Sequence, residues 1–169
     1  MKNDNLIYYD IVKSLKTTPD AEEFLLQLDN LLTKLFKINP DSLEKNLKKI
    51  VSSKFAELFK ESFKINNINQ NDHSAIEKFL NSIKNQIQQL NILKLQLAFD
   101  PTEETIDTLF RWIAENYGSG IILDIHKDES ILGGAIVTFN GKYKDLSLRK
   151  RFEDTFQKNK IDLKKTIAR

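Results

Sequence analysis

Residues 121–152 read IILDIHKDESILGGAIVTFNGKYKDLSLRKRF, and this stretch does most to decide the fold. The apolar run IILDIHK (121–127) predicts a strand, and GGAIVTF (133–139) predicts another. Asn140-Gly141 is a strong signal for a two-residue hairpin turn into KYKD. A helix that carries Leu148, Phe152 and Phe156 follows. The stretch therefore predicts a strand, a hairpin and a terminal helix.

The segment before this stretch adds one more strand and one more helix. Leu93, Leu95, Leu97 and Phe99 alternate with Lys94, Gln96 and Ala98, which is typical of a strand with one buried face. Asp100-Pro101 then predicts a helix start, and the expected inward positions are Ile106, Leu109, Phe110 and Ile113. Gly118-Ser119-Gly120 ends that helix. We therefore expect residues 92–169 to form a small α/β domain with the order strand–helix–strand–hairpin–helix.

The chain before this domain is expected to be helical. All five glycines lie between 118 and 141, so few tight turns are available earlier. Thr18-Pro19 and Asn39-Pro40 predict helix starts, as Asp100-Pro101 does, and Ser74–Glu77 reads as a capping box. The polar run INNINQND (65–72) predicts a loop. Residues 1–91 are thus expected to form an N-terminal helical bundle, and the fold class is α+β.

Composition excludes several classes of function. The 169 residues are 30% charged and 40% hydrophobic, as in a globular protein, and the net charge of +2 is low for an electrostatic nucleic-acid binder. There is no cysteine and there are only two histidines, which excludes thiolate chemistry and histidine-rich metal centres. No apolar run approaches the ~20 residues that span a bilayer, and the N-terminus lacks the pattern of a signal peptide. We expect a soluble intracellular protein without a cofactor.

Three clusters could carry chemistry, and each has a simpler interpretation. Gly133-Gly134 lacks the further residues of a phosphate-binding loop, so a bulge or a close backbone approach is favoured. Asp124, His126 and Asp128 could form a metal or acid–base site, but alternating strand positions favour a solvated face. Glu103-Glu104 falls in the first turn of a helix, where negative charge complements the helix dipole.

Two further surfaces could bind a partner. The C-terminus is basic from Arg149 onward and could contact RNA, but Leu148 and Phe152 read as core positions, so a solvated helix face is favoured. The first apolar stripe of the chain is rich in large residues, and a small bundle cannot hide every such stripe. The stripe consists of Ile7, Tyr8, Ile11, Val12 and Leu15.

The ordered set from Asp124 to Phe152 resembles the C-terminal domain of the delta subunit (OSCP) family of F-type ATP synthases. The matching features are the acidic strand ending, Ser130-Ile131-Leu132-Gly133-Gly134, Asn140-Gly141, and Asp145-x-Ser147-Leu148-Arg149 at the start of the last helix. The resemblance covers residues 93–156. It implies an N-terminal helical bundle followed by a small α/β domain, which agrees with the layout above, and architectural roles for these glycines and for Asp145 and Ser147.

The resemblance also implies a function without catalysis. In the family, delta belongs to the peripheral stalk, or stator, and links the catalytic head to the stalk during proton-driven ATP synthesis. The bundle would receive N-terminal helices of the alpha subunits, and the C-terminal domain would hold the C-terminal end of the b subunits. We expect the first apolar stripe to contact alpha. A peripheral location at the cytoplasmic face of a bacterial-type cell membrane follows, with no nucleic acid and no direct membrane insertion.

Two other hypotheses remain at this point. An RNA-binding module would use the basic C-terminal helix, and its association would depend steeply on salt. A small hydrolase would use Asp124, His126 and Asp128, and its activity would be lost in His126→Ala. Near-neutral net charge opposes the first, and nothing in the spacing supports the second beyond proximity.

Overall fold

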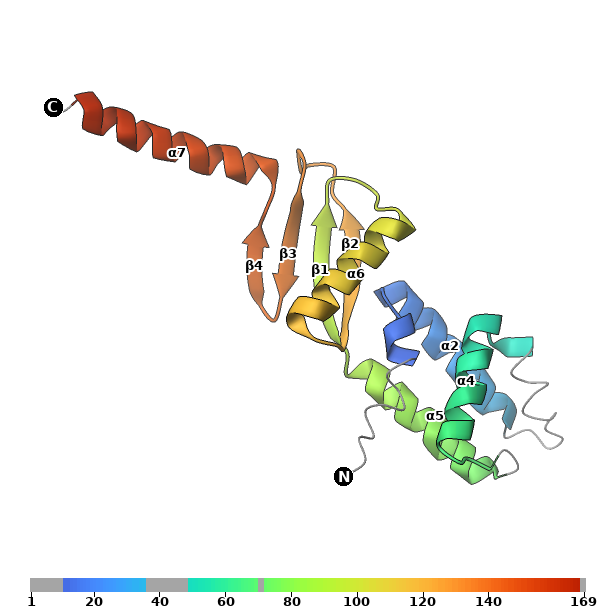
Figure 1. Ribbon diagram of the computed structural model, residues 1–169. Coiled ribbons are helices and arrows are strands. Elements are labelled where there is room, and N and C mark those ends of the chain that lie inside the picture. The colour runs from blue at the N-terminus through green and yellow to red at the C-terminus, as the bar shows by residue number, and fades with distance from the viewer. Residues whose placement is uncertain (1–10, 36–48, 70–71, 168–169) are drawn as a thin grey trace. The chain divides into compact units, whose positions relative to one another are not determined.

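The computed structural model describes residues 11–35, 49–69 and 72–167 (Figure 1). For residues 35, 54 and 158–167 it describes the backbone only. Contacts between Cα atoms divide the chain into two compact units, with the boundary between Asn91 and Ile92; residues 118–120 belong with the first unit. The elements comprise helices and one four-stranded mixed sheet, so the chain is an α+β protein.

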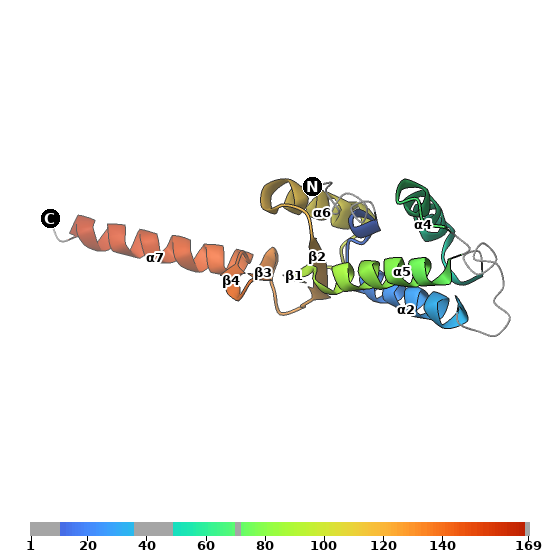
Figure 2. The same ribbon diagram turned by 90° about the horizontal axis from the view of Figure 1, so that it is seen from below.

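The first unit is built from helices. The main ones are α2 (Thr18–Leu35), α4 (Ser53–Ile65) and α5 (His73–Gln88), and residues 11–14 and 49–50 are also helical. α2 and α5 lie side by side, as Figures 1 and 2 both show, and Lys84 Nζ of α5 lies 2.6 Å from Asp29 Oδ1 of α2. The predicted helical character of this region is confirmed over the described residues.

A row of phenylalanine rings forms the core of the helical unit. Phe24 of α2 stacks on Phe59 of α4 with 5.4 Å between ring centroids, and Phe63 of α4 lies 5.3 Å from Phe79 of α5. Phe24, Phe59 and Phe63 are almost completely buried. Because aromatic pairs add about 0.5–1.5 kcal/mol each beyond the burial of their area, this row ties all three helices together.

The helices begin one to two residues away from the predicted caps. α2 is capped by Thr17, whose Oγ1 accepts from Asp20 N at 3.3 Å, rather than by Thr18. Asp72, whose Oδ1 accepts from Ala75 N at 3.1 Å, caps α5, so the predicted capping box at Ser74–Glu77 is wrong. Thr102, not Asp100, caps the helix after Pro101. In each case a nearer hydroxyl or carboxylate meets the free N–H groups. Asn39-Pro40 lies outside the described residues.

The second unit contains the sheet. Its elements are β1 (Asn91–Leu97), α6 (Glu103–Tyr117), β2 (Ile121–Lys127), β3 (Ala135–Phe139), β4 (Lys142–Asp145) and α7 (Leu148–Ile167). The strand order across the sheet is β2-β1-β3-β4. This sequence of elements is the predicted strand–helix–strand–hairpin–helix order.

Hydrogen bonds define the direction of each strand pair. Asn91 N donates to Gly120 O at the start of β1, and Asp128 N donates to Leu97 O at its end, so β1 and β2 run parallel. β3 pairs antiparallel with both β1 and β4. The β3–β4 turn has positive φ at Asn140 (49°) and Gly141 (72°), as a type I′ hairpin requires. The hairpin prediction is confirmed.

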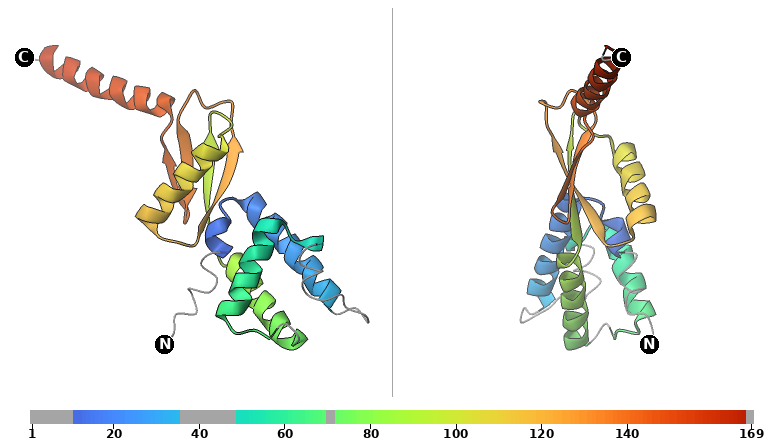
Figure 3. Two further views of the ribbon diagram at one scale, coloured as in Figure 1. Left: turned by 45° about the vertical axis from the view of Figure 1, so that its right-hand side comes forward. Right: turned by 90° about the vertical axis from the view of Figure 1, so that its left-hand side faces the viewer.

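Helix α6 covers one face of the sheet, as the edge-on view in Figure 3 shows. The core between them contains Leu93, Leu95 and Leu97 of β1, Ile113 of α6, and Ile121 and Leu123 of β2. Lys94 and Gln96 alternate with these leucines and are exposed on the opposite face. The predicted inward face of α6 is confirmed by Ile106, Leu109 and Phe110, which pack against this core. Phe99, predicted to continue the buried face of β1, lies beyond the strand and is 50% exposed.

Candidate functional site

The segment that leads into α7 is joined by backbone hydrogen bonds to the end of the β2–β3 loop and to the first residue of β3. Leu148 N donates to Gly133 O, and Leu146 N donates to Ala135 O, both at 2.9 Å. We call residues 133–135 and 145–148 the α7 joint. These two backbone bonds hold the start of α7 against residues 133–135.

Glycine is required in the α7 joint because two chain segments approach closely there. A Cβ on Gly134, whose φ is +86°, would lie 2.5 Å from the carbonyl oxygen of Leu146. A Cβ on Gly133 would lie 2.7 Å from Cδ1 of Leu148. The interpretation as a close backbone approach is confirmed for Gly134, which meets backbone atoms, whereas Gly133 faces the side chain of Leu148.

Side chains of Asp145 and Ser147 complete the joint. Ser147 is buried, and its Oγ accepts from Lys150 N at 3.2 Å, which caps the first turn of α7. Oδ1 of Asp145 accepts from Ser147 N at 2.8 Å. The hydrogen bonds from Ser147 hold the pKa of the Asp145 carboxyl below its ordinary value, with smaller contributions from Lys150 and Arg149. Both residues therefore fix the geometry of the helix start, which is the architectural role that the resemblance implied.

Beyond the joint, α7 exposes large apolar side chains. Leu148, Phe152 and Phe156 are spaced by four residues and are 41%, 62% and 71% exposed. The prediction that Leu148 and Phe152 are core positions is wrong. Helical periodicity alone cannot distinguish a stripe that packs within its own chain from one that is left for a partner.

The charged residues of the first turns of α7 pair largely among themselves. Arg149 Nε lies 3.1 Å from Glu153 Oε1, and Lys150 Nζ lies 3.1 Å from Asp154 Oδ1. The hydrogen bond from Asp154 raises the pKa of Lys150. These are ordinary i,i+4 pairs of a solvated helix face, and nothing in the described residues supports RNA binding.

Of Asp124, His126 and Asp128, the structure pairs the first two with each other and bonds the third to Ser130. His126 Nε2 lies 2.9 Å from Asp124 Oδ1 on β2, and the His126 side chain is 66% exposed. Asp128 instead accepts from the hydroxyl (2.6 Å) and N–H (2.9 Å) of Ser130, and these bonds lower the pKa of Asp128. Within the residues that the structure describes, no three His, Cys, Asp or Glu side chains are placed to hold a metal. Glu103 and Glu104 lie in the first turn of α6, as predicted.

The first apolar stripe is only partly described. Ile11 and Leu15 are completely buried, and Val12 is half-buried. Ile7 and Tyr8 lie outside the described residues. Of the three described members, Val12 is therefore the one with side-chain surface available to a partner.

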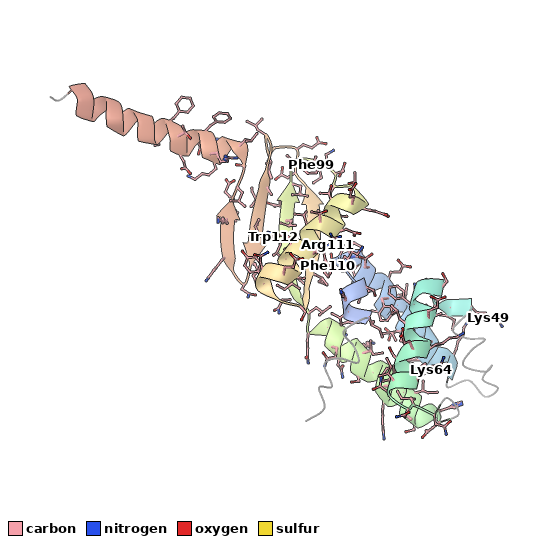
Figure 4. The ribbon with its side chains drawn as sticks, in the orientation of Figure 1. Lys49, Lys64, Phe99, Phe110, Arg111 and Trp112 are labelled. Atoms are coloured by element: carbon pink, nitrogen blue, oxygen red, sulfur yellow. The ribbon has the colours of Figure 1, made fainter. Side chains whose placement is uncertain are left out.

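Sequence reasoning missed an aromatic pair on the outer face of α6. Trp112 and Tyr117 are 53% and 60% exposed, and their rings meet edge to face with 5.8 Å between centroids. Figure 4 shows Trp112 beside Arg111 on this helix. The spacing of five residues fits no simple helical stripe, so only the exposure of the rings in the structure reveals the pair.

Comparison with known proteins identifies the family. The model for the family described as ATP synthase delta (OSCP) subunit matches residues 10–158, which cover most of each unit. No curated protein matches the chain. Over the residues described, no helix combines the length and apolar character needed to cross a membrane. Since the match covers most of its length, the chain belongs to the ATP synthase delta (OSCP) subunit family.

Proposed function

We propose that this protein joins the catalytic head of a rotary ATP synthase to the b subunits of its peripheral stalk. Its family consists of structural, generally non-catalytic stalk subunits. The observation that carries the proposal is the family match, because it extends over both units rather than over one. The N-terminal bundle would bind N-terminal helices of alpha, and the C-terminal domain would bind the C-terminal end of b, during proton-driven ATP synthesis.

This role depends on affinity and stiffness rather than on reactive groups. A stator must hold its partners through many turnovers, which requires slow dissociation and therefore extensive apolar burial. The exposed apolar stripe of α7 and its fixed joint support such a role. The protein would act peripherally, at the cytoplasmic face of a bacterial-type cell membrane.

The alpha contact is proposed on the first apolar stripe. Burial of Ile11 and Leu15 means that substituting either would disturb the folding of the unit as well as binding. Val12→Asp is the sharper test, because Val12 is half-buried. We expect weaker binding to a peptide of the alpha N-terminus with an unchanged circular dichroism spectrum. If the affinity for the peptide is unchanged, Val12 is not part of the alpha contact.

The whole proposal is tested by purifying the tagged chain from gently solubilised native membranes. We expect alpha, beta and b subunits to be recovered in a fixed ratio. Recovery of ribosomal proteins or RNA without ATP synthase subunits would refute the proposal. Treatment with nuclease before elution provides the control, since it removes partners that are held only through RNA.

A further inference from the structure

We propose that α7 binds an acidic amphipathic helix of its partner along the stripe Leu148, Phe152 and Phe156. The inference rests on the proposed function, in which the C-terminal domain binds b, and it names the surface and the chemistry of that contact. Three observations carry it: the exposure of the stripe, the charge of α7, and the contrast with α6.

The stripe has the geometry of a helix-pairing surface. Residues four apart on a helix are neighbours, so Leu148, Phe152 and Phe156 follow one another along one side of α7. Every described side chain from 149 to 157 is exposed. Two phenylalanines at 62% and 71% exposure are unusual for a helix that works alone, because rings of this size dominate the energetics of interfaces. The stripe is thus suited to the i/i+4 side chains of a second helix.

Charge determines which helix is suitable. Residues 148–167 contain seven Lys or Arg and three Asp or Glu, a net charge of +4 against +2 for the whole chain. Arg149 precedes Phe152 by three residues and Arg151 follows Leu148 by three, so the two arginines border the stripe. A partner helix with acidic residues beside its apolar face would complement them. A second copy of α7 would bring a charge of +4 against +4, so pairing of this helix with itself is disfavoured.

The outer face of α6 is the competing apolar surface on the same unit. It presents Trp112 and Tyr117, but α6 carries four Asp or Glu and a single Arg111, a net charge of −3. An acidic helix would be repelled there and attracted to α7. The charges of these two helices therefore assign the acidic partner to α7.

The joint supports the same assignment. In proteins most of the stability of a helix comes from packing of its apolar face rather than from its intrinsic propensity. Ser147 and the backbone bonds of Gly133 order the first turn of α7 but do not cover its apolar stripe. A partner helix that buries the stripe would stabilise the rest of α7 and would extend the peripheral stalk from a fixed starting point.

The test compares two variants of the full chain in the co-purification assay. Phe152→Ala/Phe156→Ala removes the rings while alanine favours the helix, and Trp112→Ala is the matched control on α6. We expect the double variant to recover as much alpha as the original chain does, but at least about tenfold less b. The Trp112→Ala variant should recover b within about twofold of the original chain.

Washing the complex with increasing salt tests the charge assignment. We expect b to be released from the original chain as salt rises, and to be released at lower salt from Arg149→Gln/Arg151→Gln. If neither salt nor the two arginine substitutions change the release of b, the proposal that the partner helix is acidic is wrong. Formation of dimers by the isolated full chain, abolished by the double phenylalanine variant, would assign the stripe to a second copy instead.

The failure of this inference is distinguishable from failure of the proposed function. If the original chain recovers alpha and b, and the double phenylalanine variant recovers both equally well, only the assignment to α7 is wrong. A larger loss of b with Trp112→Ala would place the contact on α6. If the original chain recovers neither alpha nor b, the proposed function itself fails.

Discussion

Gly134→Ala is expected to loosen the α7 joint while leaving the helical unit intact. Gly134 has a φ of +86°, and its missing Cβ would lie 2.5 Å from Leu146 O and 3.1 Å from Ser147 Cα. The obstructing atoms belong to the backbone, which cannot rotate away as a side chain could. The two segments would have to separate, and the hydrogen bond from Leu146 N to Ala135 O lies in their path.

The free-energy cost of Gly134→Ala has two separate contributions. A Cβ in the left-handed region costs roughly 1–2 kcal/mol. The contact with Leu146 O is about 0.9 Å shorter than the 3.4 Å of ordinary van der Waals contact, and relieving such crowding typically costs about 1–3 kcal/mol. Gly118→Ala is the matched control, because Gly118 has a φ of +94° and no atom within 4 Å of the added Cβ. Gly118→Ala should therefore show the cost of a Cβ in the left-handed region and no cost from crowding.

Amide hydrogen exchange measures the difference at the joint. The N–H groups of Leu146 and Leu148 donate to Ala135 O and Gly133 O, so their protection reports opening of the joint. We expect Gly134→Ala to lower this protection by about tenfold or more, since 1.4 kcal/mol corresponds to a factor of ten. Gly118→Ala should leave it almost unchanged. Protection in Gly134→Ala as high as in Gly118→Ala would refute the close-approach argument, because the joint would then have accommodated the added Cβ.

Two further predictions concern stability. Asp145 has a folded-state pKa below its unfolded value, so its hydrogen bonds contribute full stability above the ordinary pKa of about 4 and lose that contribution as pH falls through the folded value. The difference in urea midpoint between the original chain and Asp145→Asn should therefore shrink from pH 6 to pH 3, and a constant difference would contradict this. Phe59→Ala should destabilise the helical unit by about 3–5 kcal/mol, because the ring is buried between Phe24 and Phe63; urea unfolding measures this, and exposed Leu26→Ala should cost far less.

Predictions based on local signals succeeded most often. The alternation of Leu93, Leu95 and Leu97 predicted β1 and its buried face, and Asn140-Gly141 predicted the hairpin. Both signals act through neighbours in the chain: strand geometry alternates side chains, and a type I′ turn needs positive φ at two successive residues. The helix caps were misplaced because several residues able to cap stood close together, as Asp72 and Ser74 do, and only the backbone path selects among them.

Predictions about apolar stripes depended on information that the sequence does not contain. Ile11 and Phe152 both belong to stripes with helical spacing, yet Ile11 is completely buried and Phe152 is 62% exposed. The first was proposed as a binding surface and the second as core. Periodicity identifies the apolar side of a helix, but what covers that side depends on which distant segments pack against it.

The sequence by itself therefore determined the order of the elements, the hairpin, the glycine pair and the resemblance to a family, because each rests on residues close together in the chain. The tertiary structure decided which faces are covered and which are free. It brought Gly134 to the carbonyl of Leu146 and left the stripe on α7 exposed. Burial is a property of segments that meet across long separations in sequence, so only the folded chain could assign the interior and the candidate binding surface.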